Sequence, residues 1–504
     1  MVRGVIGYLE ASAGRHPDKT AFADKERSLT FLETWRIARS IGSSICESGY
    51  RRRPVAVFME KKAESVAAFL GVVCGGCFYC PLDPKMPKER LDTILSVLQP
   101  AALITDRSKE EQVEALAYDG PVFFYEEVSI HQDLGDQLDA VLDQVTEQDP
   151  LYVLFTSGST GIPKGVLVGQ RVVIDYLRWL EEAFAYSSED VFGNQAPLYF
   201  DVSVHDIYGA LYFGARMEII PPSYFSFPVR LVEYMNERKV TTFLWVPSAM
   251  GMIANLDAFQ FALPKYLRHV MFAGEVLPVK HLDYWVRYLP DAVYANLYGP
   301  TETFVCTAYV MDKEEDRDKP LPIGKPILNS RAVILDEEDC PVEDGSVGEL
   351  CMKGSCLALG YYRDPERTAA SFVIDPSNPD YPERIYRTGD LVRIDARGDL
   401  IYISRKDDQI KHMGYRIELG EIETAAAGVE GIRDCACIYD GEKKRICLCY
   451  DGRQLEKKEL EQRLAKKLPV YMMPGRFCYY PALPHNANGK IDRKRLKEMQ
   501  DEKN

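Results

Sequence analysis

The stretch Thr156-Ser-Gly-Ser-Thr-Gly-Ile-Pro-Lys-Gly165 follows the apolar run 151–155, and this order predicts a buried strand that ends in a loop. Its glycines allow tight turns, so that backbone N–H groups and hydroxyls can converge on an anion. Lys164 adds a positive charge. The glycine-to-lysine spacing does not fit a Walker loop, and no Ser or Thr follows Lys164. We interpret the stretch as a phosphate-binding loop; a flexible Ser/Gly-rich connection is the alternative.

Around this loop, short apolar runs alternate with amphipathic helical stretches from Leu29 to about residue 400. The runs that predict strands are residues 55–58, 102–105, 121–125 and 242–245. Such alternation predicts layered α/β architecture with largely parallel sheets. A β-rich pattern punctuated by glycine follows from Gly348 onward. We therefore expect an α/β fold, in which layered α/β subdomains and a β-rich subdomain form one large N-terminal domain.

The length of the chain, 504 residues, favours more than one domain. The charged stretch 404–408 lies between two apolar segments, as expected of a linker. We place the boundary there, with a large domain over residues 1–404 and a small, mobile α+β domain over residues 405–504.

Composition excludes several classes of function. The formal net charge of −15 argues against a nucleic-acid-binding protein, which would need a basic face. The 13 cysteines lie mostly in apolar stretches, which is typical of reduced thiols in a cytoplasmic protein. Cys74, Cys77 and Cys80 have the spacing of metal ligands, but no fourth cysteine is near, and we assign them to the core.

No N-terminal signal peptide is recognisable. The uncharged stretch 65–82 reaches the lower length limit of a membrane span, but Gly75, Gly76 and Pro81 interrupt it. We expect a buried helix that turns at Gly75-Gly76 into a buried strand, no membrane insertion, and a cytoplasmic location.

Five further segments occur in a fixed order around the loop. They are 76–84 (GCFYCPLDP), 296–302 (NLYGPTE), 386–390 (YRTGD), 405–421 (with RKDDQIK and GYRIELGE) and 488–493 (NGKIDR). With them the chain resembles the adenylate-forming, or AMP-binding, enzymes: acyl- and aryl-CoA ligases, luciferases and the adenylation domains of nonribosomal peptide synthesis. The resemblance covers nearly the whole chain.

The resemblance implies that ATP is the co-substrate, with Mg²⁺. Attack of a carboxylate on the α-phosphate brings two anions together, so positioned cations and N–H donors are needed. The phosphate loop would hold the β- and γ-phosphates, Tyr298 would lie against the adenine, Asp390 would bind the ribose, and Glu302 would help to bind Mg²⁺. The residues expected to bind ATP are Thr156, Ser157, Gly158, Ser159, Thr160, Gly161, Lys164, Asn296, Tyr298, Gly299, Thr301, Asp390, Arg405 and Lys490.

The same resemblance assigns catalytic roles to Lys490, Lys164 and Arg405. Lys490 would bridge the substrate carboxylate and the α-phosphate; read in isolation it is a solvated turn residue. Rotation of the small domain about a hinge at Asp407 would then bring Gly414 to the tunnel for a pantetheine thiol. The chain departs from the family pattern at Ser404, where glycine is usual.

Asp201, in the stretch 200–208 (FDVSVHDIY), discriminates among substrates. In the amino-acid-activating branch an aspartate at this position binds the α-ammonium group, and a buried carboxylate needs such a partner. The alternative is an aspartate that caps a helix beginning near Ser203. The pocket residues implied by the resemblance are Asp201, Val202, His205, Leu244, Met271, Ala273, Gly274, Leu297, Val305 and Cys306.

Most of these pocket residues are apolar, which favours a small or medium apolar amino acid such as alanine or proline. The stretches 272–278 and 200–208 most resemble D-alanine–D-alanyl carrier protein ligases and stand-alone adenylation domains. Ala273 and Gly209 depart from that ligase, which has Cys and Pro there, so D-alanine is one candidate among several.

We expect the acceptor to be the phosphopantetheine thiol of a separate acyl or peptidyl carrier protein, because no carrier domain follows in this sequence. Two alternatives stay open: an acyl- or aryl-CoA ligase, and a catalytically silent AMP-binding scaffold.

Overall fold

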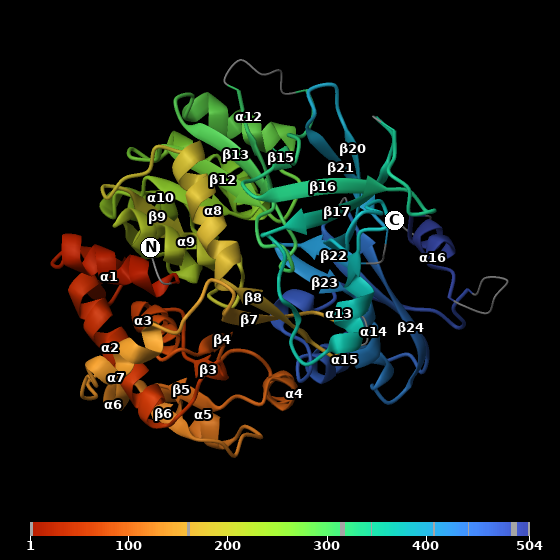
Figure 1. Cartoon of the computed structure of the whole chain (residues 1–504). Helices are drawn as coiled ribbons and strands as arrows, with labels where there is room; N and C mark the ends of the chain where they lie inside the picture. The colour runs from red at the N-terminus through yellow and green to blue at the C-terminus, as the bar shows by residue number, and fades with distance from the viewer. Residues whose placement is uncertain are drawn as a thin grey trace.

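A computed structural model describes residues 4–158, 162–312, 318–343, 345–406, 409–441, 443–484 and 491–501, the side chains of 494 and 501 excepted. These residues form five sheets, with helices between and around them (Figure 1). The helices are α1 (Ile6–Arg15), α2 (Phe31–Glu47), α3 (Ala63–Cys74), α4 (Lys88–Leu98), α5 (Glu110–Glu114), α6 (Tyr125–Val128), α7 (Asp136–Leu142), α8 (Gln170–Ala183), α9 (Val202–Phe213), α10 (Pro228–Glu237), α11 (Pro247–Asn255), α12 (Val279–Tyr288), α13 (Pro365–Ser371), α14 (Leu419–Ala427), α15 (Lys457–Leu464) and α16 (Arg493–Asp501).

The sheet that carries the phosphate loop has seven strands. In spatial order they are β18 (Gly360–Tyr361), β8 (Lys164–Gly169), β7 (Pro150–Thr156), β4 (Phe78–Leu82), β3 (Pro54–Phe58), β5 (Ala102–Thr105) and β6 (Val122–Phe124). Strands β7, β4, β3, β5 and β6 run parallel, and β8 returns antiparallel to β7. The strands predicted at residues 55–58, 102–105 and 121–125 are confirmed as β3, β5 and β6.

A second sheet of nine strands is also mostly parallel. Its spatial order is β15 (Lys325–Pro326), β14 (Thr307–Val310), β13 (Val293–Tyr298), β12 (His269–Ala273), β11 (Thr242–Trp245), β9 (Val191–Asn194), β10 (Arg216–Ile219), β1 (Thr20–Ala23) and β2 (Ser28–Thr30). The expectation of largely parallel sheets is confirmed, with antiparallel strands only towards the edges.

Both sheets are buried on two faces because their strands are apolar at successive positions. On β3, Val55 and Val57 belong to the central core that also contains side chains of α1, α2, α3, α8 and α9. Ala56, which faces the other way, packs in the core under α4. On β12, Met271 lies in the central core, whereas Val270 packs under α10, α11 and α12. Helices thus fill the space between the two sheets and cover their outer faces.

The apolar stretch 65–82 is α3, a turn and β4, as predicted. Gly76 at that turn has φ +71°, a conformation that glycine adopts without strain. Cys74, Cys77 and Cys80 are buried among apolar side chains. No helix in the described ranges is long and apolar enough to cross a membrane.

The β-rich segment forms a third, antiparallel sheet. Its strands are β16 (Ser330–Leu335), β17 (Gly348–Gly354), β20 (Arg384–Ile394), β19 (Phe372–Ile374) and β21 (Leu400–Arg405). The predicted division of the chain at 404/405 falls at the end of β21 and stays a prediction.

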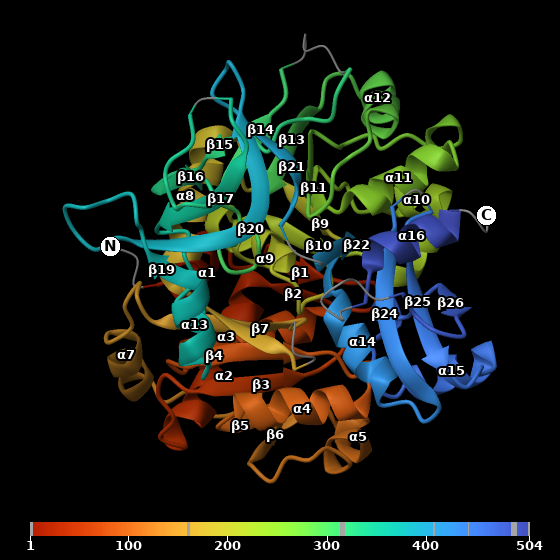
Figure 2. The ribbon, with the colours of Figure 1, turned by 90° about the vertical axis from the view of Figure 1, so that its right-hand side faces the viewer.

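The C-terminal segment forms a hairpin, β22 (Gln409–His412) with β23 (Tyr415–Glu418), and a three-stranded sheet. That sheet contains β24 (Ile432–Asp440), β25 (Arg445–Gly452) and β26 (Arg476–Tyr479), packed with α14, α15 and α16. This segment, drawn in blue, lies along one side of the molecule, while its hairpin reaches towards the centre (Figure 2).

Candidate active site

The phosphate loop joins β7 to β8, whose ends are paired through Thr156 and Lys164. The Oγ1 atom of Thr156 is buried and has no hydrogen-bond partner among the described residues. Such an orphaned donor next to a lysine fits an anionic ligand. Ser159, Thr160 and Gly161 lie outside the described residues.

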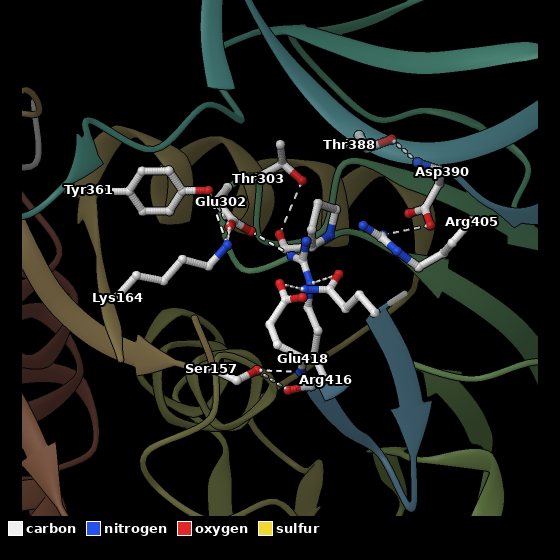
Figure 3. Close-up of polar contacts among 12 residues, drawn as sticks. Ser157, Lys164, Glu302, Thr303, Tyr361, Thr388, Asp390, Arg405, Arg416 and Glu418 are labelled. Atoms are coloured by element: carbon white, nitrogen blue, oxygen red, sulfur yellow. Dashed lines mark hydrogen bonds and ion pairs between the residues drawn. The ribbon is translucent and has the colours of Figure 1, made fainter. Parts of the chain in front are cut away.

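Glu302 lies at the centre of a charged cluster beside this loop (Figure 3). Lys164 Nζ is 3.0 Å from Oε1 and Arg416 Nη1 is 2.7 Å from Oε2, and the Tyr361 hydroxyl donates to Oε1 at 2.7 Å. Burial alone would raise the pKa of the Glu302 carboxyl, but the charges of Arg416 and Lys164 outweigh it and hold that pKa below its ordinary range. The carboxylate is therefore ionised and paired on both oxygens.

Asp390 and Arg405 are cross-strand partners on β20 and β21. The sheet register brings Arg405 Nη1 to 2.8 Å from Asp390 Oδ1, and the Tyr298 hydroxyl donates to the other carboxylate oxygen. Burial and the neighbouring charge of Asp390 raise the pKa of Tyr298 well above its ordinary value. Three of the residues that the sequence assigned to nucleotide binding are thus joined through Asp390.

Lys411, on β22, completes this group. Its ammonium lies 5.2 Å from the ring centroid of Tyr298 and 5.5 Å from that of Tyr402. Burial lowers the pKa of Lys411, although the charge of Asp390 acts in the opposite direction. The cation is held between two aromatic rings, where the resemblance places the adenine and ribose.

A cavity of about 120 Å³ lies between the loop, α9 and the hairpin. The predicted residues that line it are Thr156, Ser157, Asp201, Val202, Leu244, Ala273, Gly274, Gly299, Thr301, Val305, Asp390, Arg405 and Gly414. A second cavity, of about 1500 Å³, shares Gly274, Arg405 and Lys411 with the first. The fold therefore brings predicted nucleotide, amino-acid and thiol residues to two cavities that share part of their walls.

Asp201 both caps α9 and faces the smaller cavity. Its Oδ1 accepts the N–H of Val202 at 2.8 Å, so the helix-capping interpretation is confirmed. Burial raises the pKa of the Asp201 carboxyl against the opposing hydrogen bonds of Thr301 and the Val202 backbone. Within the described ranges Asp201 has no ion-pair partner. A buried carboxylate in this state favours a cationic ligand.

The remaining predicted residues that the structure describes lie outside the smaller cavity. Asn296 donates to the carbonyl of Pro322 at 2.7 Å, and Asn296, Leu297 and Tyr298 line the larger cavity. Met271 and Cys306 are fully buried and line neither cavity. Gly158 and Lys164 of the phosphate loop, and Glu302 beside it, line neither cavity. Lys490 and Asp407 lie outside the described residues.

His205 also lies behind the wall, on the inner face of α9. Its Nδ1 is 2.7 Å from the Tyr176 hydroxyl, and its Nε2 has no hydrogen-bond partner among the described residues. Burial lowers the pKa of His205 to about 3, so the imidazole is neutral. His205 supports the pocket floor through Tyr176, which packs edge-to-face on the cavity-lining Phe304 at 4.7 Å.

Sequence reasoning missed Arg416, Lys411 and Tyr361. Arg416 and Lys411 stand in the segment 405–421 that carried the resemblance, yet only Arg405, Asp407 and Gly414 were singled out there. Tyr361 carried no sequence signal, because its place beside Lys164 depends on the pairing of β18 with β8. With these residues the site has the cations Lys164, Arg416, Arg405 and Lys411. Their combined positive charge exceeds the negative charge of the carboxylates in the site, so the site can bind a further anion.

Comparison with known proteins agrees with this geometry. The family model for "AMP-binding enzyme" matches residues 9–362. The L-proline–[L-prolyl-carrier protein] ligase of Streptomyces coelicolor is 32% identical over 98% of this chain and 96% of its own length. Tyrocidine synthase 3 of Brevibacillus parabrevis is 32% identical over 98% of the chain, which spans only 8% of that protein.

Among solved structures, holo-PA1221, an NRPS protein containing adenylation and PCP domains, superimposes with a TM-score of 0.85. It is 25% identical, and the match covers 98% of this chain and 84% of that one. The matches to these relatives extend over nearly the whole chain and so include the phosphate loop and the Asp390–Arg405 pair. The protein belongs to the family of AMP-binding enzymes.

Proposed function

We propose that the chain activates an amino acid as its aminoacyl adenylate and passes the aminoacyl group to the phosphopantetheine thiol of a carrier protein. In the first step a carboxylate oxygen bonds to the α-phosphorus of ATP, the bond to the β-phosphate breaks, and pyrophosphate leaves. In the second step the thiol sulfur bonds to the carbonyl carbon, AMP leaves, and the thiol proton is lost.

The observation that carries the amino-acid assignment is Asp201. Its carboxylate is buried, faces the small cavity and has no ion-pair partner among the described residues. Burial raises its pKa, because the charged form lacks a compensating charge. An α-ammonium group supplies the missing charge. A fatty or aryl acid has no such group, so Asp201 favours an amino acid over the substrates of acyl- or aryl-CoA ligases.

The walls of the cavity favour a small or medium apolar side chain. Val202, Leu244, Ala273 and Val305 line it, and its volume is about 120 Å³. D-Alanine stays a candidate from the sequence, and proline gains support from the similarity to a prolyl-carrier ligase. One methylene group changes binding by only about 1–3 kcal/mol, so wall residues rank these candidates weakly.

The phosphate end of ATP would lie between the loop and the cation cluster. Thr156, Ser157 and Lys164 would bind the β- and γ-phosphates through hydroxyl, N–H and ammonium groups. Arg405 would approach the α-phosphate, with its orientation fixed by the 2.8 Å contact to Asp390, while that carboxylate receives the ribose hydroxyls. Lys490 is assigned the chemical step on the resemblance alone.

Glu302 would hold Mg²⁺. Among the described residues no group of three or more His, Cys, Asp or Glu side chains could bind a metal by itself. A single ionised carboxylate beside a phosphate site still fits Mg²⁺, which binds through one or two carboxylates and phosphate oxygens. When bound, the ion would neutralise charge on the leaving pyrophosphate.

Amino-acid-dependent exchange of labelled pyrophosphate into ATP, measured over the twenty amino acids and their D-isomers, tests the proposal. We expect exchange with a small apolar amino acid, abolished by Lys490→Ala, while transfer from preformed adenylate survives that change. Exchange with acids that lack an α-amino group, unaltered by Asp201→Ala, would instead establish a CoA-ligase type of enzyme. Nucleotide binding without any exchange would establish a silent scaffold.

A further inference from the structure

The hairpin β22–β23 binds the phosphate loop directly. The Ser157 hydroxyl donates to the backbone carbonyl of Arg416 at 2.9 Å and accepts the N–H of Glu418 at 3.1 Å (Figure 3). The hydroxyl that would serve a phosphate oxygen is thus engaged by the C-terminal segment.

The side chain of Arg416 likewise occupies a position at Glu302 that a ligand would need. Its Nη1 lies 2.7 Å from Glu302 Oε2, and its Nε donates to Gln409 on the neighbouring strand. Lys164 already occupies Oε1 at 3.0 Å. Arg416 thus occupies the second oxygen of the carboxylate proposed for Mg²⁺, and the Glu302 side chain has no exposed surface.

Arginine and a divalent cation cannot share this carboxylate without strong repulsion in a buried site. Arginine is suited to the position because its planar fork reaches Glu302 and Gln409 at once, which a lysine ammonium cannot do in the same geometry. Glu302 can therefore be paired with Mg²⁺ or with Arg416, and each partner excludes the other.

The seated hairpin also places Gly414 at the mouth of the amino-acid cavity. Its N–H donates to Glu275 Oε1 at 2.8 Å. Its φ is +82°, and a Cβ there would lie 2.4 Å from Val246 Cγ1, so only glycine fits without displacement. A second buried ion pair, Arg90 with Glu421, anchors α14 beside the hairpin. The contacts of Gly414 with Glu275 and of Glu421 with Arg90 thus form together when the C-terminal segment is seated in this way.

We propose that Arg416 is a positioning residue that replaces Mg²⁺ at Glu302 when pyrophosphate leaves, and so couples product release to seating of the hairpin. The proposal rests on the proposed function for the identity of the leaving ion. Seating places Gly414 for the thiol step, and rebinding of Mg²⁺ with pyrophosphate releases the hairpin.

The experiment compares the wild type with Arg416→Gln and with the conservative Arg416→Lys. Arg433→Gln is the matched control. This variant loses the ion pair of Arg433 with Asp451, which lies in the same segment but outside the site. Hydrogen–deuterium exchange of peptides covering 409–418 reports seating of the hairpin. Calorimetric titration with Mg²⁺ and pyrophosphate reports competition at Glu302, and neither measurement requires turnover.

In the wild type and in Arg433→Gln, we expect Mg²⁺ with pyrophosphate to accelerate exchange of the hairpin. In Arg416→Gln the hairpin should exchange fast without ligand, Mg²⁺ with pyrophosphate should bind at least threefold more tightly, and transfer from preformed adenylate should fall at least tenfold. Pyrophosphate exchange into ATP should fall less than this transfer does. Arg416→Lys should give intermediate values.

Weaker binding of Mg²⁺ with pyrophosphate by Arg416→Gln, with the hairpin still protected, would overturn the proposal and make Arg416 a phosphate ligand. Equal loss of both half-reactions would do the same. If the wild type activates no amino acid, the proposed function fails, yet hairpin exchange and ligand titration still decide the role of Arg416.

Discussion

Two carboxylates of the candidate site, Glu302 and Asp201, differ in how the surrounding residues balance their charge. Glu302 receives Lys164, Arg416 and Tyr361, and its pKa lies below the ordinary range. Asp201 has no ion-pair partner among the described residues, and burial raises its pKa. Removing one partner of a buried ion pair leaves an uncompensated charge and destabilises the fold, whereas a buried carboxylate left for a ligand costs stability until the ligand binds.

The sharpest test of this contrast is Glu302→Gln. The change keeps the shape of the side chain but leaves two buried cations without their counter-charge, so we expect unfolding free energy to fall by about 3–5 kcal/mol. Urea denaturation followed by tryptophan fluorescence measures it. An unchanged transition midpoint would mean that Lys164 and Arg416 are stable without the carboxylate.

The same isosteric change at Asp201 should act on binding. Losing the partner of a buried ammonium costs about 2–5 kcal/mol, so Asp201→Asn should weaken amino-acid binding by at least about 25-fold. The KM for the amino acid in pyrophosphate exchange reports this effect, while the KM for ATP should change little. A parallel rise in both KM values would place Asp201 outside the amino-acid site.

The pH dependence of activation should show the raised pKa of Asp201. Below that pKa the carboxyl is neutral and cannot bind the ammonium, so kcat/KM for the amino acid should fall as pH decreases through it. In Asp201→Asn the residual activity should lack this acidic limb. The comparison becomes weaker if both proteins show the same limb, because another group would then cause it.

The smallest effect should be on the stability of the ligand-free protein, with a sign opposite to that of Glu302→Gln. A folded-state pKa raised above the unfolded value means that the Asp201 carboxyl favours folding while protonated and disfavours it once ionised, as pH rises through that pKa. At neutral pH, Asp201→Asn should therefore raise the denaturation midpoint. A lower midpoint would show that capping of α9 by the carboxylate outweighs the cost of its burial.

Much of the fold could be predicted because it follows from local pattern. Residues 55–58 and 242–245 are buried at every position, and such largely apolar runs become strands covered on both faces. The turn at Gly75-Gly76 and the strand before the phosphate loop were predictable for the same reason. The fixed order of the motifs also indicated the family, because each motif is a short stretch of sequence that can be recognised without knowing the fold.

Within the site, sequence alone identified the residues that carry charge or hydrogen bonds, but not their partners. It selected Lys164, Glu302, Asp390 and Arg405, and the fold brings them together. Its pocket residues Met271, Cys306 and His205 lie behind the walls, because which side of a helix or strand meets a cavity depends on packing between elements.

What the sequence by itself determined is the layered α/β architecture, the phosphate loop and the family, all of which are encoded in short stretches of chain. Only the tertiary structure decided that Arg416 pairs with Glu302, that Tyr298 contacts Asp390, and that Asp201 has no ion-pair partner among the described residues. The physical reason is distance along the chain: the contact of Glu302 with Arg416 joins residues 114 apart. Its strength depends on burial, which no local pattern specifies.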